Sequence, residues 1–143
     1  MTIKVSALEL EDLYTFNNVD RASLIESAKF NLEHPHFRRM FSMKDDKGYL
    51  VAVIGASYIS KGVWEGWIFP CADVGKYAKR LVREVKDFSD WALTLDIHRL
   101  QIAVLEPNKK WAESIGFQFE SIVKNYHSNK DHFMYIKAGS YGC

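Results

Sequence analysis

Between residues 37 and 69, short apolar runs alternate with groups of turn-forming residues. The runs and turns are, in order, 37–43, DDKG (45–48), 49–59, SKG (60–62) and 63–69. Tight turns between runs of strand-forming residues predict a meander of three antiparallel strands. The segment YLVAVIGA (49–56) is apolar at successive positions, which predicts a central strand covered on both faces.

The period of the pattern changes at Val74. From there, apolar residues recur at steps of three and four, which predicts one long helix with a single buried stripe. The stripe consists of Val74, Ala78, Leu81, Val85, Phe88 and Ala92. Basic residues on the remaining faces alternate with Glu84, Asp87 and Asp90, so we expect a solvated face and no nucleic-acid partner.

The first 30 residues predict a short strand and two helices. The strand is TIKV (2–5), and SALE (6–9) fits a capping box that opens the first helix. Asp20 is placed to cap the second helix, which carries Leu24 and Ala28 inward.

The last third of the chain returns to strands. RLQIAVL (99–105) predicts one strand, and a short helix follows from about Asn108 to Gly116. Two alternating segments, 117–126 and 132–138, predict a closing hairpin.

The element order is β-α-α-β-β-β-α-β-α-β-β, an α/β fold. We expect a mixed, mostly antiparallel sheet of about six or seven strands with helices on both faces. The length of 143 residues and the lack of any repeat or linker predict a single domain over 1–143.

The amino-acid composition narrows the classes of protein to which this chain is expected to belong. An apolar fraction of 48% is typical of a globular chain, and 19 basic against 18 acidic residues create no field that draws it to nucleic acid or membrane. No apolar run is long enough to span a bilayer, and no signal-peptide core precedes the first helix. The two cysteines, Cys71 and Cys143, are expected to be free thiols, so we expect a cytoplasmic protein.

The segment WIFPCADVGKYAKRLVREV (67–85) joins a predicted strand to the long helix through a tight turn. A helix N-terminus in this position is able to hold a phosphate group. An ordinary strand-to-helix connection with a basic, solvated face explains the same residues. The residues of this segment leave both explanations open.

Over essentially the whole chain, the order of elements resembles the GNAT superfamily of acetyl-CoA-dependent N-acetyltransferases. DVGKYA (73–78) matches the family loop Gln/Arg-x-x-Gly-x-Gly/Ala, and NKKWAESIGF (108–117) is similar to an asparagine-led helix that ends in Leu-Gly-Phe. The final hairpin also looks like that of the family. The eroded loop and basic third helix look like the small GNAT-like proteins of short-tailed phages, which would place the protein in the host cytoplasm.

The resemblance implies that acetyl-CoA binds as cosubstrate along the fourth strand and at the start of the next helix. In the family, loop amides hold the pyrophosphate and the strand pairs with the pantetheine arm. The implied coenzyme-binding residues are Ile68, Phe69, Cys71, Val74, Gly75, Lys76, Tyr77, Ala78, Lys79 and Asn108. A capping role after Pro107 accounts for Asn108 equally well.

Two residues depart from the family loop. Asp73 replaces the leading Gln/Arg, and its carboxylate suits the helix dipole but repels a phosphate at the same place. Lys76 replaces the first glycine, and its ammonium would supply a compensating charge. In addition, Ala112 stands where many members carry a tyrosine as general acid. A degraded, inactive site is therefore a second hypothesis.

Three residues are candidates for the chemistry. Glu65 shares a strand face with Trp67 and Phe69, and aromatic neighbours are expected to raise its pKa toward that of a useful base. Tyr126 and Tyr135, on the closing hairpin, are candidates to protonate the departing thiolate. A solvent-facing charge at Glu65 and simple packing of both tyrosines are the alternatives.

No metal site is expected, because His34 and His36 lack a third ligand nearby in the sequence. Together these features predict an N-acetyltransferase that acts on an amine, such as a protein lysine or N-terminus. The alternative is a catalytically inactive GNAT-like binding protein or a phage virion-associated or host-interaction protein. No motif identifies the acceptor or the oligomeric state.

Overall fold

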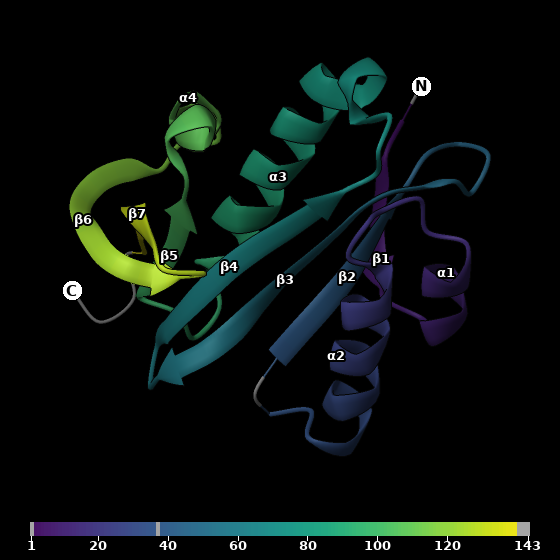
Figure 1. Cartoon of the computed structure of the whole chain (residues 1–143), viewed down its shortest axis with the longest axis horizontal. Helices are drawn as coiled ribbons and strands as arrows, with labels where there is room; N and C mark the ends of the chain where they lie inside the picture. The colour runs from purple at the N-terminus through teal and green to yellow at the C-terminus, as the bar shows by residue number, and fades with distance from the viewer. Residues whose placement is uncertain (1, 37, 140–143) are drawn as a thin grey trace. The chain divides into compact units, whose positions relative to one another are not determined.

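The computed structural model describes residues 2–36 and 38–139. Over these residues, hydrogen bonds join seven strands in the order β1-β2-β3-β4-β5-β7-β6 (Figure 1). Contacts divide the chain into two compact units. The first unit comprises Met1–Tyr58 and Trp67–Leu81, and the second comprises Ile59–Gly66 and Val82–Cys143.

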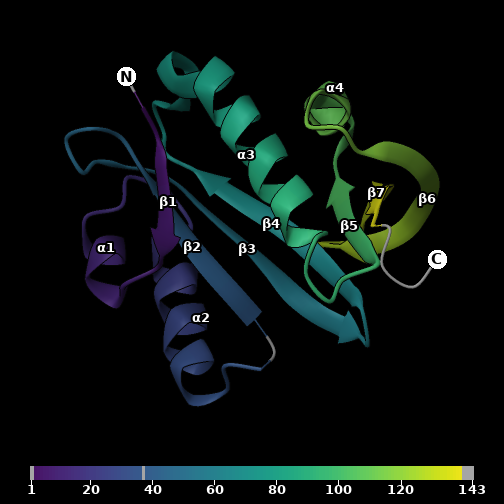
Figure 2. The same ribbon diagram turned by 180° about the vertical axis from the view of Figure 1, so that it is seen from behind.

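The first unit contains the meander and the two N-terminal helices. Its elements are β1 (Lys4–Ala7), α1 (Leu10–Tyr14), α2 (Arg21–Glu33), β2 (Arg38–Lys44), most of β3 (Leu50–Ser60) and the second half of β4 (Val63–Pro70). The pairs β1/β2 and β2/β3 are antiparallel. Helices α1 and α2 pack on each other beside β1 and β2 (Figure 2).

The core of the first unit is built around β3. Its residues from Leu50 to Gly55 are all buried, as the run of successive apolar residues predicted. Gly55 is required by a close approach, because a Cβ there would lie 2.4 Å from the Trp67 ring. The indole Nε1 of Trp67 donates to Ser57 Oγ over 3.3 Å, so the ring is fixed at one end.

The second unit contains the C-terminal half of the chain. Its elements are the first half of β4, most of α3 (Ala78–Ala92), β5 (Arg99–Val104), α4 (Lys109–Ser114), β6 (Gln118–His127) and β7 (Lys130–Ala138). β4 pairs with β5 in parallel, whereas β5/β7 and β6/β7 are antiparallel. A single 3-10 turn, η2 (Glu106–Asn108), precedes α4, and a second one, η1 (Val74–Tyr77), precedes α3 and belongs to the first unit.

The predicted fold class and order of elements are confirmed, including the mixed sheet, and the single-domain assignment stays a prediction. No helix in the described part of the chain is long and apolar enough to cross a membrane.

The predicted capping box at residues 6–9 is wrong. Ser6 lies in β1, pairs with Ser42 and shares a 3.0 Å hydrogen bond between the two hydroxyls. The helix begins one turn later, where Asp12 accepts from the Glu9 backbone N–H. Pairing with a distant strand overrides the local helix signal here.

The predicted stripe of the long helix also needs one correction. Ala78 is exposed and Tyr77 is buried instead. The helix starts with a 3-10 turn of three residues per turn, so the inward face is displaced from the position that an α-helical period predicts.

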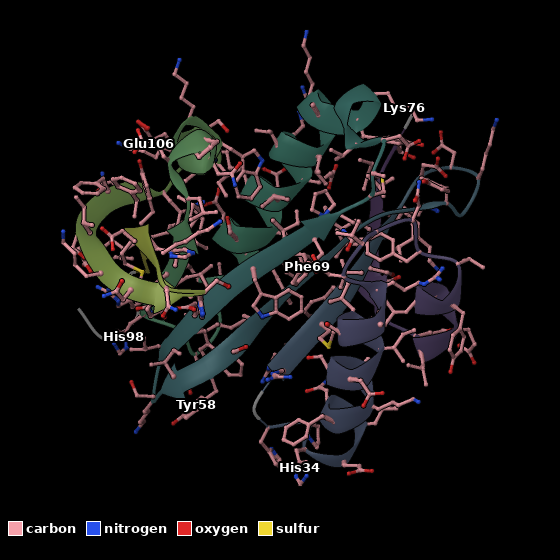
Figure 3. All side chains as sticks on the ribbon, in the orientation of Figure 1. His34, Tyr58, Phe69, Lys76, His98 and Glu106 are labelled. Carbon is pink, nitrogen blue, oxygen red and sulfur yellow. The ribbon has the colours of Figure 1, made fainter. Side chains whose placement is uncertain are left out.

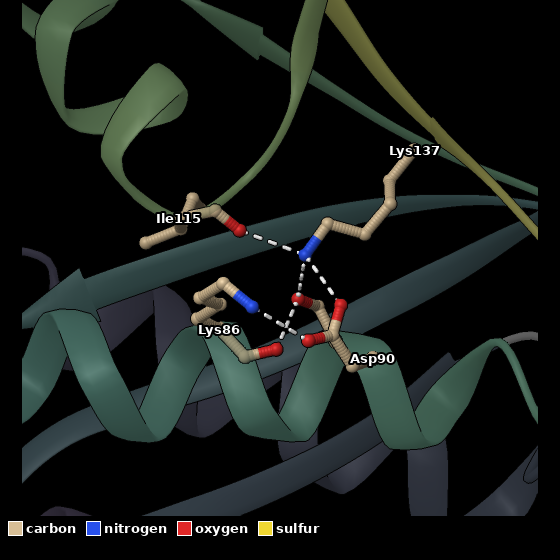
Figure 4. Close-up of polar contacts among 5 residues, drawn as sticks. Lys86, Asp90, Ile115 and Lys137 are labelled. Atoms are coloured by element: carbon tan, nitrogen blue, oxygen red, sulfur yellow. Dashed lines mark hydrogen bonds and ion pairs between the residues drawn. The ribbon is translucent and has the colours of Figure 1, made fainter.

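A lysine of β7 ties three elements of the second unit together (Figure 4). Lys137 Nζ donates to the Ile115 carbonyl after α4 over 2.7 Å and to Ser89 Oγ on α3 over 2.8 Å. It also lies 3.0 Å from Asp90 Oδ1, while Lys86 Nζ bonds the other Asp90 oxygen. Hydrogen bonds from Lys86 and then Lys137 lower the pKa of Asp90.

We expect Lys137→Met to destabilise the fold much more than Lys86→Met. The side chain of Lys137 is only 10% exposed and its loss leaves a carbonyl and a hydroxyl without their donor, which costs about 1–3 kcal/mol. Lys86 is half exposed and contributes one surface pair, worth about 0.5 kcal/mol. Urea unfolding at pH 7 measures both variants, and equal losses would contradict the role given to Lys137.

Candidate functional site

Glu65 is the centre of a hydrogen-bonded group in the second unit. It lies near the start of β4, opposite Gln101 of β5 in the parallel ladder, and its side chain is 16% exposed. Its Oε1 atom accepts two hydrogen bonds, from Gln101 Nε2 over 2.9 Å and from the Tyr126 hydroxyl over 2.6 Å. We call these three residues, with Arg99 and Glu120, the Glu65 network.

Arg99 and Glu120 extend the network and fix its orientation. The two guanidinium NH2 groups of Arg99 donate to the two oxygens of Glu120 over 2.7 and 2.6 Å. Arg99 Nε donates to Gln101 Oε1 over 3.1 Å, so the amide of Gln101 must turn its NH2 group toward Glu65. The hydrogen bonds from Arg99 also lower the pKa of Glu120. The result is a continuous chain of donors that ends on Glu65.

Tyr126 joins the network from β6. Burial, followed by the hydrogen bond to Glu65, raises the pKa of Tyr126 to about 12. The phenol therefore keeps its proton and directs it to Glu65 Oε1. In this geometry Tyr126 holds the carboxylate in place, and its predicted role as acid for the thiolate stays a prediction.

The strand β6 is irregular where it reaches Glu65. Its pairing with β7 shifts register between Val123 and His127, and Asn125 has φ +51°, a left-handed value that Asn tolerates better than most residues. The Asn125 backbone N–H donates to Asp131 Oδ1 over 3.1 Å. The strand also curves strongly (Figure 1).

This bulge brings a further side chain to Glu65. In a regular strand, successive side chains point to opposite faces. Here the Tyr126 hydroxyl and His127 both approach Glu65, with His127 Nε2 3.8 Å from Oε2. His127 was not predicted from the sequence as a functional residue. Asn125 within an otherwise alternating strand was the available signal, because Asn is enriched at bulged, left-handed positions.

The surroundings of Glu65 differ from those expected. The polar partners of its carboxylate are Gln101, Tyr126 and His127, in place of the predicted aromatic face. Trp67 and Phe69 belong to the first unit, where their rings pack on each other with centroids 5.5 Å apart.

Tyr135, the other tyrosine candidate, is placed differently. It is 1% exposed and lies in β7 with its ring edge-on to Phe119, centroids 5.7 Å apart. Burial raises the pKa of Tyr135. Within the described residues, no polar contact joins it to Glu65, so the structure does not bring it into the network.

In the first unit, the predicted pyrophosphate loop has its own set of contacts. Asp73 Oδ2 lies 3.0 Å from Lys76 Nζ, and Asp73 Oδ1 accepts from the Tyr49 hydroxyl over 2.9 Å. Lys76, with Cys71 and Tyr49, holds the pKa of Asp73 well below its usual range. The bond to Asp73 and burial raise the pKa of Tyr49 to about 12. Figure 3 marks Lys76 at the start of the helix.

These contacts change the predicted charge balance of the loop. Asp73 was expected to repel a phosphate and Lys76 to compensate, but the two form an ion pair with each other. Their charges largely cancel before any ligand arrives. Gly75 between them borders open space, because a Cβ there would meet no atom within 4 Å.

The other predicted coenzyme residues of the first unit fall into three groups, which are half-buried, exposed and buried. Ile68, Phe69 and Val74 are half-buried, and Ala78 and Lys79 are exposed at the start of α3. Tyr77 is buried and its hydroxyl donates to Asp45 over 3.0 Å, so its side chain is occupied. Cys71 is also buried, and its backbone N–H donates to the Val51 carbonyl over 2.7 Å.

Asn108 lies in the second unit, where it is exposed at the N-cap position of α4. Its side chain makes no capping hydrogen bond. The capping explanation of this asparagine therefore has no support in the contacts of its side chain.

Among the described residues, no group of three His, Cys, Asp or Glu side chains is placed to hold a metal ion. His34 and His36 are exposed at the end of α2 and beyond it.

No protein-family model matches the sequence, and a search of curated proteins finds no match. Solved structures match over nearly the whole chain. Ribosomal-protein-S5-alanine acetyltransferase from Vibrio fischeri has a TM-score of 0.79 at 15% identity, covering 99% of this chain and 95% of that one. Spermidine N-acetyltransferase from Vibrio cholerae, in complex with CoA and spermine, has a TM-score of 0.76 at 20% identity, covering 97% and 96%.

A variant of the same Vibrio cholerae enzyme has a TM-score of 0.78 at 17% identity, covering 96% of this chain and 94% of that one. At these identities the likeness defines the fold. The chain has the GNAT N-acetyltransferase fold, as its sequence resemblance predicted.

We expect Cys71 to be nearly inert toward maleimide in the folded protein. Burial, with a contribution from Asp73, raises the pKa of its thiol from 9.0 to about 11, so the thiolate is about a hundredfold scarcer at pH 8. The test uses the Cys143→Ser variant, because Cys143 is the second of the two cysteines and its removal leaves Cys71 as the only thiol that can be labelled. Labelling followed by mass spectrometry should be slow in buffer and fast in urea. Fast labelling in buffer would show that Cys71 is accessible.

Proposed function

We propose that this protein is an acetyl-CoA-dependent N-acetyltransferase that acts on a primary amine. The observation that carries the proposal is the Glu65 carboxylate, of which one oxygen is fixed by two donors and the other accepts no hydrogen bond from residues 2–36 and 38–139. An amine is protonated near neutral pH and must lose a proton before it attacks a thioester. Glu65 takes that proton, and the amine nitrogen bonds to the acetyl carbon as the carbon–sulfur bond breaks. The second proton that the nitrogen loses neutralises the departing coenzyme A thiolate.

The coenzyme pyrophosphate is assigned to the turn from Asp73 to Lys79 in the first unit. Backbone N–H groups at a helix start attract phosphate oxygens, and Gly75 leaves room for them. Lys79 adds a positive charge there. The backbone at Ile68, Phe69 and Cys71 lines the path proposed for the pantetheine arm. Asn108 stays a candidate coenzyme contact.

The acceptor is assigned only as a primary amine. The names of the similar structures refer to spermidine, spermine and the alanine of a ribosomal protein, all of which present amines. A protein lysine or N-terminus remains our finer proposal. The same base, Glu65, would deprotonate the ammonium group of each of these acceptors.

A second candidate function is coenzyme binding without transfer. Ala112, at the position of the general-acid tyrosine of many GNAT members, is completely buried. A tyrosine could not replace it without displacing its neighbours, so this chain has no acid at that point. Binding of acetyl-CoA with no acetylated product would favour this function. The association with phage particles stays a prediction.

We expect acetyl-CoA to bind at about 1–100 μM, and Gly75→Glu to weaken binding about tenfold relative to Gly75→Gln. Both side chains extend into the open space over Gly75, but only Glu adds a charge that repels the pyrophosphate. The two variants are matched in size, so their difference isolates electrostatics. Calorimetry measures the affinities. Equal affinities would place the pyrophosphate elsewhere, and no binding to the wild type would remove the proposed function.

Glu65→Gln should lower acetyl transfer by about 100- to 10,000-fold and leave acetyl-CoA affinity unchanged. The glutamine keeps an oxygen for Gln101 and Tyr126 and replaces only the free oxygen by an amide nitrogen. Glu33→Gln is the control, because it makes the same change at an exposed glutamate of α2 outside the network and should keep the wild-type rate. Mass spectrometry of spermine and of peptides with a lysine or an N-terminal alanine detects the product. Full activity of Glu65→Gln would refute the assignment of the base.

A further inference from the structure

The two oxygens of Glu65 have different surroundings. Oε1 accepts from both Gln101 and Tyr126. The Nε2 atom of the His127 imidazole lies 3.8 Å from Oε2. A carboxylate oxygen with two donors is a poorer proton acceptor than one with none, since each donor stabilises its negative charge. Oε2 is therefore the oxygen on which an incoming proton is held.

The proton must then leave Glu65 before the next cycle. Glu65 is 16% exposed, and Oε1 is covered by its two donors. The side chain of His127 is 62% exposed, so it is in contact with both Oε2 and the solvent. Imidazole is the side chain best suited to accept and release a proton near neutral pH.

The β6 bulge supports a specific placement of this histidine. Tyr126 and His127 would point to opposite faces of a regular strand, yet the bulge at Asn125 brings both to one carboxylate. Asp131 holds the bulge by accepting from the Asn125 N–H. A left-handed residue held in this way has an energetic cost, which suggests a function for the geometry that it produces.

We propose that His127 carries the proton from Glu65 to solvent in each catalytic cycle. This inference rests on the proposed acetyl transfer and extends it by one residue. The ammonium N–H bond breaks as an O–H bond forms at Oε2. That O–H bond then breaks as an N–H bond forms at His127 Nε2, directly or through one water, and the imidazolium returns the proton to buffer. Glu65 ends as a carboxylate and His127 as neutral imidazole, so no other reactant is needed.

The groups around His127 are compatible with this role. The centroid of its ring lies 4.3 Å from that of the Tyr126 ring. It lies 5.4 Å from the centroid of the His132 ring of β7, to which it is edge-on. Lys130 is its partner in the β6/β7 ladder, and Glu65 of β4 is the nearby carboxylate. The Nδ1 atom of His132 is engaged with the Lys130 carbonyl at 2.9 Å, and His132 is buried. His127 is thus the exposed member of the pair.

The test is chemical rescue of His127→Asn by imidazole. In weakly buffered solution we expect the variant to transfer acetyl groups about tenfold more slowly than the wild type, with acetyl-CoA affinity unchanged. Added imidazole should restore the rate in a saturable manner, because free imidazole takes the proton from Glu65 in place of the side chain. Sodium chloride at equal ionic strength should restore nothing. The matched control is His36→Asn, which replaces an exposed histidine of the first unit. Its rate should respond to neither imidazole nor sodium chloride.

The outcomes separate the two proposals. A wild-type rate for His127→Asn in weak buffer would overturn the inference and leave acetyl transfer standing. A slow variant that imidazole does not restore would also overturn it, because His127 would then act only through packing or charge. No transfer by the wild-type protein to any of the amines would remove the proposed function and this inference with it.

Discussion

The parallel pairing of β4 with β5 is the constraint on which the Glu65 network depends. The ladder runs from Val63 to Glu65 on β4 and places Glu65 opposite Gln101. β5 in turn pairs with β7, and β7 with β6, so that Arg99 from β5 and Glu120 and Tyr126 from β6 reach the same group. A shift of one residue in the β4/β5 pairing would turn Glu65 to the opposite face of the sheet from these side chains.

A carboxylate that is largely withdrawn from water is costly unless donors replace the lost hydration. The network supplies these donors in series, because Arg99 orients the Gln101 amide and Gln101 then donates a hydrogen bond to Glu65. Such a chain is satisfied only when every member is present, which makes the group rigid. In the first unit, the ion pair of Asp73 and Lys76 achieves local neutrality with two residues three positions apart.

Local pattern predicted the elements well, because the period of apolar residues reports which face is buried. The predicted central strand, long helix and closing hairpin all form. Glu65 and Tyr126 were each named from the sequence, but their contact joins residues 61 positions apart, and no local pattern encodes such a pairing. The placement of His127 depends on one left-handed residue, Asn125. The placement of Ser6 depends on pairing with a distant strand. The Asp73–Lys76 pair was within reach of sequence reasoning, since its spacing of three is typical of a helical turn.

The bulge in β6 also has a consequence for how this sequence is free to vary. Substitutions on the exposed side of the closing hairpin change little, but the number of residues between Val123 and Asp131 decides which side chains face Glu65. From the pair Val123/His132 to the pair His127/Lys130, β6 advances by four residues and β7 by two, so a deletion of two residues of β6 there would restore the regular ladder. Tyr126 and His127 would then point to opposite faces of the sheet. Among homologous chains with the same site, this hairpin should therefore vary in composition while its length stays constant.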